Sequence, residues 1–433
     1  MDSLSFKIIK TESKTRISIL KTTKNLEIEC PNFIYPTRRG SHNHLTPDNL
    51  ELIPEIKCLS IGVGDIITKP GISTLKKYNE YILQKKNPNK QKNETEKTTT
   101  LDQPTNTNKD KETEIINKPG IASFYALKNK LIFLTLRDPF LFQMTVPSIK
   151  NSVVITSYEG SSVKISAQDY NTLITEANPD IWTNLYSEQL PMPTGKKLMK
   201  LTAKNNQWAK NFSTVPKPKQ TGFFSIIEGG SEIKQRQNSI SQSVDKNCEG
   251  IVIGSLFLGE TACQRQEILG IINEKIQEDK PKILIGDGQI TDVLEAIEAG
   301  VDLFCGFFPE FVSELKLVLN LTDLFSLENV LKGDLSKFKG EFYKEYLINI
   351  CDPKFRDSLK PLVQGCNCFT CQNHKSCYLY HLANSHEMTF DVLITIHNLW
   401  QFSNFFVMIR EAIKIGKFTE YKKLILDYLE ENQ

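Results

Sequence analysis

The sequence predicts an α/β protein: a (β/α)8 TIM-type barrel with an N-terminal strand-rich segment and a C-terminal zinc-binding helical subdomain. Two observations predict it. Apolar runs of strand length alternate with helix-compatible stretches through the middle of the chain, a pattern typical of a parallel sheet. Three cysteines also fall within six residues, from Cys366 to Cys371, and His397 follows 26 positions later.

Composition limits the possible functions. The chain has 433 residues, enough for one large domain and a small one, and a net charge of only +2. Any contact with nucleic acid must therefore come from a local basic patch. No apolar stretch approaches the roughly 20 residues needed to cross a bilayer. Residues 1–16 are polar and lack the apolar core of a signal peptide. We expect a soluble protein in a reducing compartment.

The N-terminal region alternates apolar and polar residues like half-buried strands. Strands are predicted over residues 4–9, 16–20 and 25–29, and apolar runs at 130–136 and 152–157 have strand length. Between these two groups, residues 84–119 contain almost no large apolar side chains. Such a segment cannot offset its ordering entropy by burial, so we predict a disordered insertion in a surface loop.

The middle of the chain repeats a strand-then-helix unit. Strands are predicted over 223–227, 250–258, 282–285 and 301–308, and helices over about 231–245, 262–277 and 292–299. Thr291 is a plausible N-cap and Gly300 a plausible C-terminal stop for the last of these helices.

Glycines follow several of these strands at their C-terminal ends, where a TIM barrel builds its active site. A doubly wound open sheet is the alternative, but no G-x-G-x-x-G motif follows a first strand.

The last part of the chain is predicted to be helical, over residues 378–400, 405–415 and 421–431. We place the barrel with its N-terminal strands in residues 1–345 and the zinc-binding subdomain in 346–433. The residues Phe402, Phe405, Phe406 and Ile409 form either an interface stripe or a simple core face. The basic residues Arg410, Lys414, Lys417, Lys422 and Lys423 either contact phosphate or line a solvated helix face.

The spacing C-x-C-x-x-C-x25-H is typical of a structural zinc site. Three thiolates and one imidazole complete a tetrahedral shell and leave no open position for substrate. Scattered cysteines and the reducing context argue against disulfides. The predicted ligands are Cys366, Cys368, Cys371 and His397, for one Zn2+ per chain. On spacing alone the fourth ligand stays open, because four competitors are nearby: His374, Cys377, His381 and His386.

These features together resemble the queuine/archaeosine tRNA-guanine transglycosylase family. The motifs that carry the resemblance are IIEGG (226–230), GIVIGSLFLGE (250–260), KPKILIGDG (280–288), GVDLFCGFFP (300–309), PLVQGCNCFTCQNH (361–374) and HNLWQFSNFFVMIREAI (397–413). The resemblance implies a TIM barrel with a structural zinc and supports His397 as the fourth ligand. It also implies a reaction in which an aspartate attacks the ribose of tRNA, so that queuine replaces guanine at the wobble position.

The chain departs from the family pattern in its pocket. Cys305 stands where the family carries its nucleophilic aspartate, and Asp302 matches an aspartate that catalytic members also keep. Glu228 stands where the family has a base-reading glutamine, and Ser187, ahead of Glu188, where it has a base-binding aspartate. The D-S-G-G-F-Q segment has no counterpart in residues 136–143. We expect no catalytic residue in this chain.

The resemblance therefore implies a non-catalytic subunit. Its expected partners are the catalytic subunit of queuine tRNA-ribosyltransferase, in a heterodimer, and tRNA. The expected location is the cytoplasm, with peripheral association on the cytosolic face of the mitochondrial outer membrane. Two alternatives stay open: an active homodimeric transglycosylase with a rearranged site, and a stand-alone zinc-dependent RNA-binding module in residues 346–433.

Overall fold

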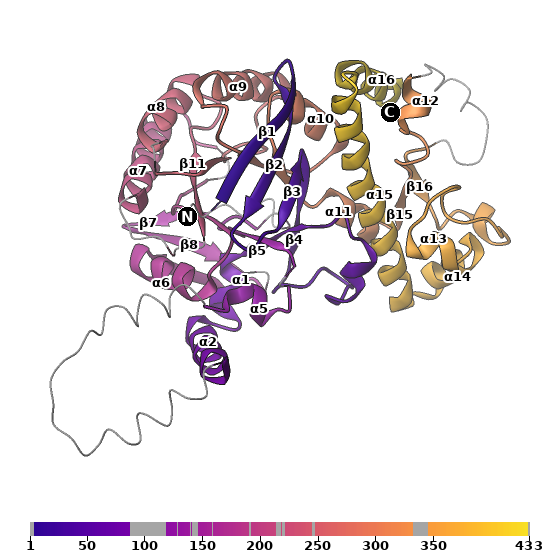
Figure 1. The fold of residues 1–433 in the computed structure, drawn as a ribbon, viewed down its shortest axis with the longest axis horizontal. Coiled ribbons are helices and arrows are strands. Elements are labelled where there is room, and N and C mark those ends of the chain that lie inside the picture. Colours follow the sequence, from indigo (N-terminus) through magenta and orange to yellow (C-terminus); the bar gives the residue numbers. More distant parts are fainter. Residues whose placement is uncertain are drawn as a thin grey trace.

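Eight parallel strands close into a barrel, which confirms the predicted fold class (Figure 1). The computed structural model describes residues 4–86, 118–127, 129–138, 140, 146–157, 159–189, 192–213, 218, 221–244, 247–331 and 345–431. Around the barrel the order is β10 (Ile181–Thr183), β11 (Gly222–Ile227), β12 (Gly250–Ile253), β13 (Lys282–Ile285), β14 (Leu303–Cys305), β4 (Asn32–Thr37), β5 (Cys58–Gly62) and β6 (Leu131–Thr135).

Helices surround this barrel in the manner of β/α units (Figure 1). They are α1 (Val63–Thr68), α2 (Ile72–Lys86), α5 (Gly120–Phe124), α6 (Ala167–Ala177), α7 (Gly195–Ser213), α8 (Ile233–Ser243), α9 (Ala262–Lys275), α10 (Ile290–Glu298) and α11 (Phe308–Glu314). Of the predicted insertion, residues 84–86 form the end of α2. Residues 118–119 precede α5, and the rest lies outside the described residues.

The predicted N-terminal strands form an antiparallel sheet of β1 (Leu4–Glu12), β2 (Thr15–Thr22) and β3 (Glu27–Cys30). This sheet lies across the barrel (Figure 1). Arg16 of β2 forms a buried ion pair of 2.6 Å with Asp302, the residue just before β14. The sheet therefore covers the end of the barrel where the strands begin.

Several predicted boundaries were wrong for local reasons. The predicted strand 250–258 ends at Ile253, because Ser255 and Phe257 adopt positive φ angles of 51° and 61°. The predicted strand 301–308 shrinks to β14. Thr291 is not the N-cap of α10, since the helix already begins at Ile290 after Gln289. Gly300 follows the end of that helix at φ 87°, as predicted.

Two smaller sheets lie outside the barrel. One contains β7 (Ser148–Ile149), β8 (Ser152–Thr156) and β9 (Ser162–Ser166), and the other contains β15 (Leu317–Leu319) and β16 (Leu347–Asn349). The C-terminal region contains α12 (Leu327–Leu331), α13 (Phe369–Asn373), α14 (Ser376–Ser385), α15 (Met388–Lys414) and α16 (Phe418–Glu431).

The predicted helix 378–400 was wrong, because it covers parts of two helices. α14 ends at Ser385, before His386 takes a left-handed conformation with φ 56°, and α15 then runs without a break through residues 401–404. The expectation that no apolar stretch is long enough to cross a bilayer was wrong for α15, whose length and composition would allow it, but 72% of its most apolar window is buried inside the protein. It is therefore a core helix of this fold.

The long helix α15 joins two hydrophobic cores. One core extends from the barrel into α15 and α16, and the other surrounds the clustered cysteines. The four residues predicted as either an interface stripe or a core face, Phe402, Phe405, Phe406 and Ile409, are at most 1% exposed. Phe402 contacts Phe33 of β4 with ring centroids 4.9 Å apart. The core-face alternative was therefore right and the interface stripe wrong.

Candidate functional site

The sequence-predicted ligand atoms converge in the C-terminal region. The three cysteine sulfurs and one imidazole nitrogen all lie within 4.8 Å of one another, and all four residues are buried. His397 Nδ1 lies 3.8, 3.3 and 3.4 Å from the sulfurs of Cys366, Cys368 and Cys371. Tetrahedral zinc with typical bond lengths would put sulfur and nitrogen about 3.5 Å apart. The donor set and its spacing fit a metal ion.

A second hydrogen bond sets the tautomer of this histidine. His397 Nε2 lies 2.9 Å from the carbonyl oxygen of Leu319, which can only accept, so Nε2 carries the proton. The lone pair of Nδ1 therefore faces the three sulfurs, as a metal ligand requires.

Local turn chemistry places the cysteines. Gly365, at φ 78°, reverses the chain just before Cys366. The sulfur of Cys368 caps α13 by accepting the backbone N–H of Cys371 at 3.3 Å. The four competing ligands lie outside the cluster. Geometry thus favours His397 as the fourth donor, while metal binding itself stays a prediction.

The position predicted to have lost the nucleophile lies inside the barrel. Cys305, the last residue of β14, is fully buried, and its thiol donates to Ser60 Oγ at 3.5 Å. Burial raises the pKa of this thiol to about 12, so it stays protonated at neutral pH. Such a thiol is a weak nucleophile.

Asp302 immediately precedes β14, at the opposite end of that strand from Cys305. Arg16 donates to both of its carboxylate oxygens, at 2.8 and 2.6 Å, and the backbone N–H of Lys282 donates to Oδ2 at 2.8 Å. These bonds use Asp302 to fix the N-terminal sheet to the barrel, at the end away from Cys305.

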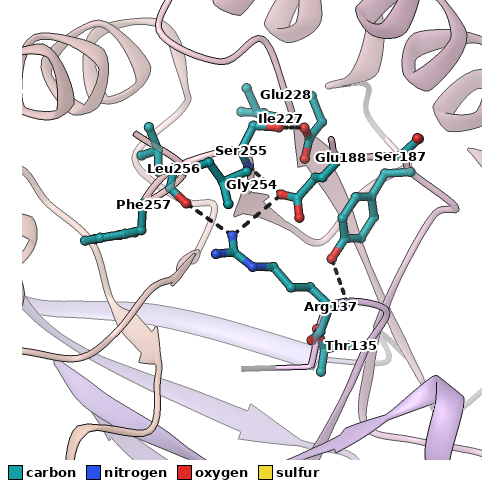
Figure 2. Close-up of polar contacts among 12 residues, drawn as sticks. Thr135, Arg137, Ser187, Glu188, Ile227, Glu228, Gly254, Ser255, Leu256 and Phe257 are labelled. Carbon is teal, nitrogen blue, oxygen red and sulfur yellow. Dashed lines mark hydrogen bonds and ion pairs between the residues drawn. The ribbon is translucent and has the colours of Figure 1, made fainter. Parts of the chain in front are cut away.

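A cluster of buried charges occupies the other end, where β6, β10, β11 and β12 finish (Figure 2). Arg137 Nη1 donates to the carbonyl oxygen of Leu256 at 3.1 Å and lies 3.8 Å from Glu188 Oε1. The backbone N–H of Ser255 donates to Glu188 at 2.7 Å, and the Ser255 hydroxyl donates to Glu228. Burial, aided by Glu188, raises the pKa of Glu228 well above its usual range.

Arg236 holds the frame of this cluster. Its guanidinium donates to the carbonyl oxygens of Gly230, Ile227, Gly254 and Ser255 at 2.7–3.0 Å. Burial lowers the pKa of Arg236 to about 10, which leaves it charged at neutral pH. Ser187, the other sequence-predicted pocket residue, is also buried and donates to the carbonyl oxygen of Val146 at 2.8 Å. Its hydroxyl is therefore engaged in the protein's own structure.

Part of the segment without a family counterpart can be described. Arg38 stacks 4.3 Å over the ring of Phe140 and lies 3.9 Å from Asp138. Pro139 and residues 141–143 lie outside the described residues. The role of Arg137 in the same segment was not predicted, because no local sequence signal reports the side chain's contacts with Glu188 and Leu256, which lie far along the chain.

A cleft of about 440 Å3 lies beside the cluster, between the loops that follow β12 and β13. Its lining is acidic, with Glu260, Asp287, Asp292 and Glu295, and Arg265 forms ion pairs with Glu260 and Asp292. Burial raises the pKa of Asp287 to about 6. Four acidic residues beside a single arginine do not favour the binding of phosphate in this cleft.

The predicted basic run of the C-terminus is largely neutralised within the chain. Arg410 is 5% exposed and pairs with Glu29 at 3.4 Å. Lys417 and Lys422 form ion pairs of 2.7 and 2.5 Å with Glu420 and Glu298. Lys414 lies 3.7 Å from Glu411. These pairings weaken the phosphate-contact alternative.

The fold and the site together define a class: a parallel β/α barrel with a buried Cys3His centre in an appended helical region. Within that class, the chain belongs to the queuine tRNA-ribosyltransferase family, whose model matches residues 82–430. It is 25% identical to a zebrafish (Danio rerio) protein named queuine tRNA-ribosyltransferase accessory subunit 2, over 71% of this chain and 80% of that one. A chicken (Gallus gallus) protein of the same name is 28% identical over 71% and 79%. A Francisella tularensis subsp. novicida queuine tRNA-ribosyltransferase is 30% identical over 62% and 66%.

Proposed function

We propose that this chain is a non-catalytic accessory subunit of a queuine tRNA-ribosyltransferase, which pairs with a catalytic subunit and helps to dock tRNA. The exchange of guanine for queuine at the wobble position would then take place on the partner. The observation that carries the proposal is Cys305. A fully buried, protonated thiol ends the strand where the family places its nucleophilic aspartate. The accessory-subunit names of the zebrafish and chicken relatives support the same assignment.

The cysteine cluster supports a structural zinc. Cys366, Cys368, Cys371 and His397 supply four donors, which would close a tetrahedral shell and leave no position for substrate. When bound, the ion would hold the loop before α13 against α15. Its role would then be to shape a surface.

An exposed aromatic surface adjoins this cluster and is our candidate for partner docking. Phe369 and Tyr378 are 39% and 41% exposed, and the ring of His374 lies between them, with centroids 6.1 and 5.3 Å away. Leu359, 76% exposed, is held nearby because Cys377 donates its backbone N–H to Ser358 at 3.0 Å. We call these four residues the zinc-face patch. Exposed aromatic residues beside a rigid metal centre suit a stable protein interface.

The test is co-purification with the catalytic subunit, followed by incorporation of labelled guanine into tRNA. We expect incorporation by the pair and none by this chain alone. Incorporation by this chain alone, abolished in Cys305→Ala, would instead establish the active homodimer. A fragment of residues 346–433 that bound tRNA as well as the full chain would favour the stand-alone RNA-binding module.

A paired variant tests the docking surface. Phe369→Ala with Tyr378→Ala should weaken pairing by at least tenfold, since truncated interface anchors commonly cost about 2 kcal/mol or more. Met199→Ala is the control, because Met199 is 54% exposed on α7, far from α13 and α14 (Figure 1). An equal loss of pairing affinity in the paired variant and in the control would refute the zinc-face patch as the docking surface. Association with the mitochondrial outer membrane stays a prediction, which cell fractionation would test.

A further inference from the structure

A buried arginine fills the end of the barrel where a free ligand would enter. Arg137 is 1% exposed and lies just after β6. Its backbone is fixed on both sides: its N–H donates to Tyr186 Oη at 3.1 Å, and its carbonyl oxygen accepts from Thr135 Oγ1 at 2.8 Å. The guanidinium therefore points inward from a rigid support, as Figure 2 shows.

The groups around this guanidinium are acceptors that other strands hold in place. The Leu256 carbonyl accepts at 3.1 Å, and Glu188, itself 1% exposed, lies 3.8 Å away. Glu188 cannot turn away easily, because Oε1 also accepts the backbone N–H of Ser255 at 2.7 Å. These contacts come from the segment after β10 and from the loop after β12, and they surround Arg137 with a preformed cradle.

The cradle has more acceptor capacity than the chain uses. Among the described residues, Glu188 Oε2 and Glu228 Oε1 are buried and have no hydrogen-bond partner. Gly254 makes room for the second of these oxygens, since a Cβ there would lie 2.1 Å from Glu228 Oε1. Buried acceptors without donors are costly, so a site that keeps two of them is suited to a ligand with several planar N–H donors.

We propose that this cradle is a binding site for a guanidinium-type group, and that Arg137 is its permanent internal occupant. The arginine thereby closes the barrel to free planar bases. The proposal rests on the contacts of Arg137 and on the buried acceptors of Glu188 and Glu228, and it goes beyond the assignment as an accessory subunit. Failure of either would leave the other standing.

Chemical rescue tests the proposal. Arg137→Ala should lower the Tm, because it leaves Glu188 buried without its cation. Guanidinium chloride at millimolar concentration should then restore at least half of the lost Tm, because the free ion can fill the vacated cradle. Equimolar sodium chloride, urea and methylammonium chloride should not, since each lacks either the charge or the planar set of donors.

Two reference proteins make the result decisive. The wild type should lose stability slightly in guanidinium, as expected of a denaturant. Leu134→Ala truncates a fully buried apolar side chain of β6, the strand that precedes Arg137, and guanidinium should not raise its Tm. A wild-type Tm in Arg137→Ala would overturn the proposal. So would a variant that guanidinium does not stabilise, or that methylammonium stabilises equally well.

Arg137→Lys covers the case in which the alanine variant does not fold. It keeps the charge and loses the planar fork, so its Tm should fall by about 3 °C or more. A Tm within about 1 °C of the wild type would show that a positive charge is enough, and the guanidinium site would be refuted.

Discussion

If the chain is the non-catalytic subunit that we propose, Cys305 and Arg137 would each prevent catalysis in a different way. The first is not the carboxylate that the family chemistry needs, and the second occupies the space in front of Glu188 and Leu256. Because the two features are independent, changing one should not restore activity.

Cys305→Asp is therefore expected to give no transglycosylase activity in this chain alone. Labelled guanine incorporated into tRNA is the measurement, and a catalytic subunit from the same preparation is the positive control. Activity above that of wild type would mean that the pocket is open despite Arg137.

The acidic cleft allows a prediction about pH. Burial raises the pKa of Asp287 to about 6, above the usual value near 4 for an aspartate in an unfolded chain. Between about pH 4 and 6 the folded state therefore binds a proton that the unfolded state does not. The stability that this proton contributes is lost as the pH rises through that range. Asp287→Asn should raise the Tm at pH 7.5 and change it little at pH 4. A Tm difference independent of pH would contradict this account.

The sequence was most informative for the residues whose metal-binding chemistry is evident from their spacing. Cys366, Cys368 and Cys371 are so close in the chain that few folds could separate them. His397 was less secure on spacing, and its place follows from where α15 crosses the loop before α13. Arg137 could not be predicted, because its contacts join residues more than 50 positions apart in the chain.

At the scale of elements, sequence predicted the strands that are uniformly apolar and missed those that are short or interrupted. β11 and β13 were found nearly to the residue. β4 contains Pro36, which argues against a central strand, and β10 has only three residues. The end of α14 was missed because His386 takes the left-handed turn that glycine usually marks.

The loop before α13 should depend on the metal. Cys368→Ser is expected to lose the single zinc and to destabilise the C-terminal region, since a thiolate ligand disappears while serine can still cap α13. Elemental analysis and limited proteolysis measure the two effects. Cys377→Ser is the matched control, because Cys377 lies outside the cluster. Full zinc occupancy in Cys368→Ser would refute the assignment.

The N-terminal sheet should depend on one ion pair. Asp302→Ala would leave Arg16, 5% exposed, without its carboxylate, which should cost about 3–5 kcal/mol of unfolding free energy. Urea denaturation measures this loss. Lys21→Ala is the comparison, since both side chains of its ion pair with Glu27 in the same sheet are about half exposed, and a loss of only about 1 kcal/mol or less is expected. Equal losses of unfolding free energy in the two variants would mean that the Arg16–Asp302 ion pair matters no more than an exposed one.

The whole molecule is organised around α15. Its first half supplies His397 to the cysteine cluster, and its second half supplies Phe402 and Phe406 to the barrel core. Trp400 lies between them and packs against both cores. The metal centre and the barrel are thus mechanically linked.

Removal of the metal should therefore be visible at Trp400. A strong chelator is expected to change the tryptophan emission at a temperature where the barrel stays folded by circular dichroism. Trp400→Phe should abolish most of that change, since the chain's other tryptophans, Trp182 and Trp208, lie in barrel elements. An unchanged spectrum in the wild type, with zinc verified as removed, would disprove the linkage.

The position of α15 has a consequence for biosynthesis. Phe402 and Phe406 cover Phe33 of β4, and Arg410 donates to the carbonyl oxygen of Pro31 at 3.0 Å. A nascent chain that has reached residue 345 still lacks these partners. Translation adds about 5–20 residues per second, and Phe402 follows Phe33 by 402 − 33 = 369 positions, so the first strands of the barrel wait roughly 20–70 seconds for the helix that covers them. During that time their apolar surface is exposed to chaperones and to aggregation on the ribosome.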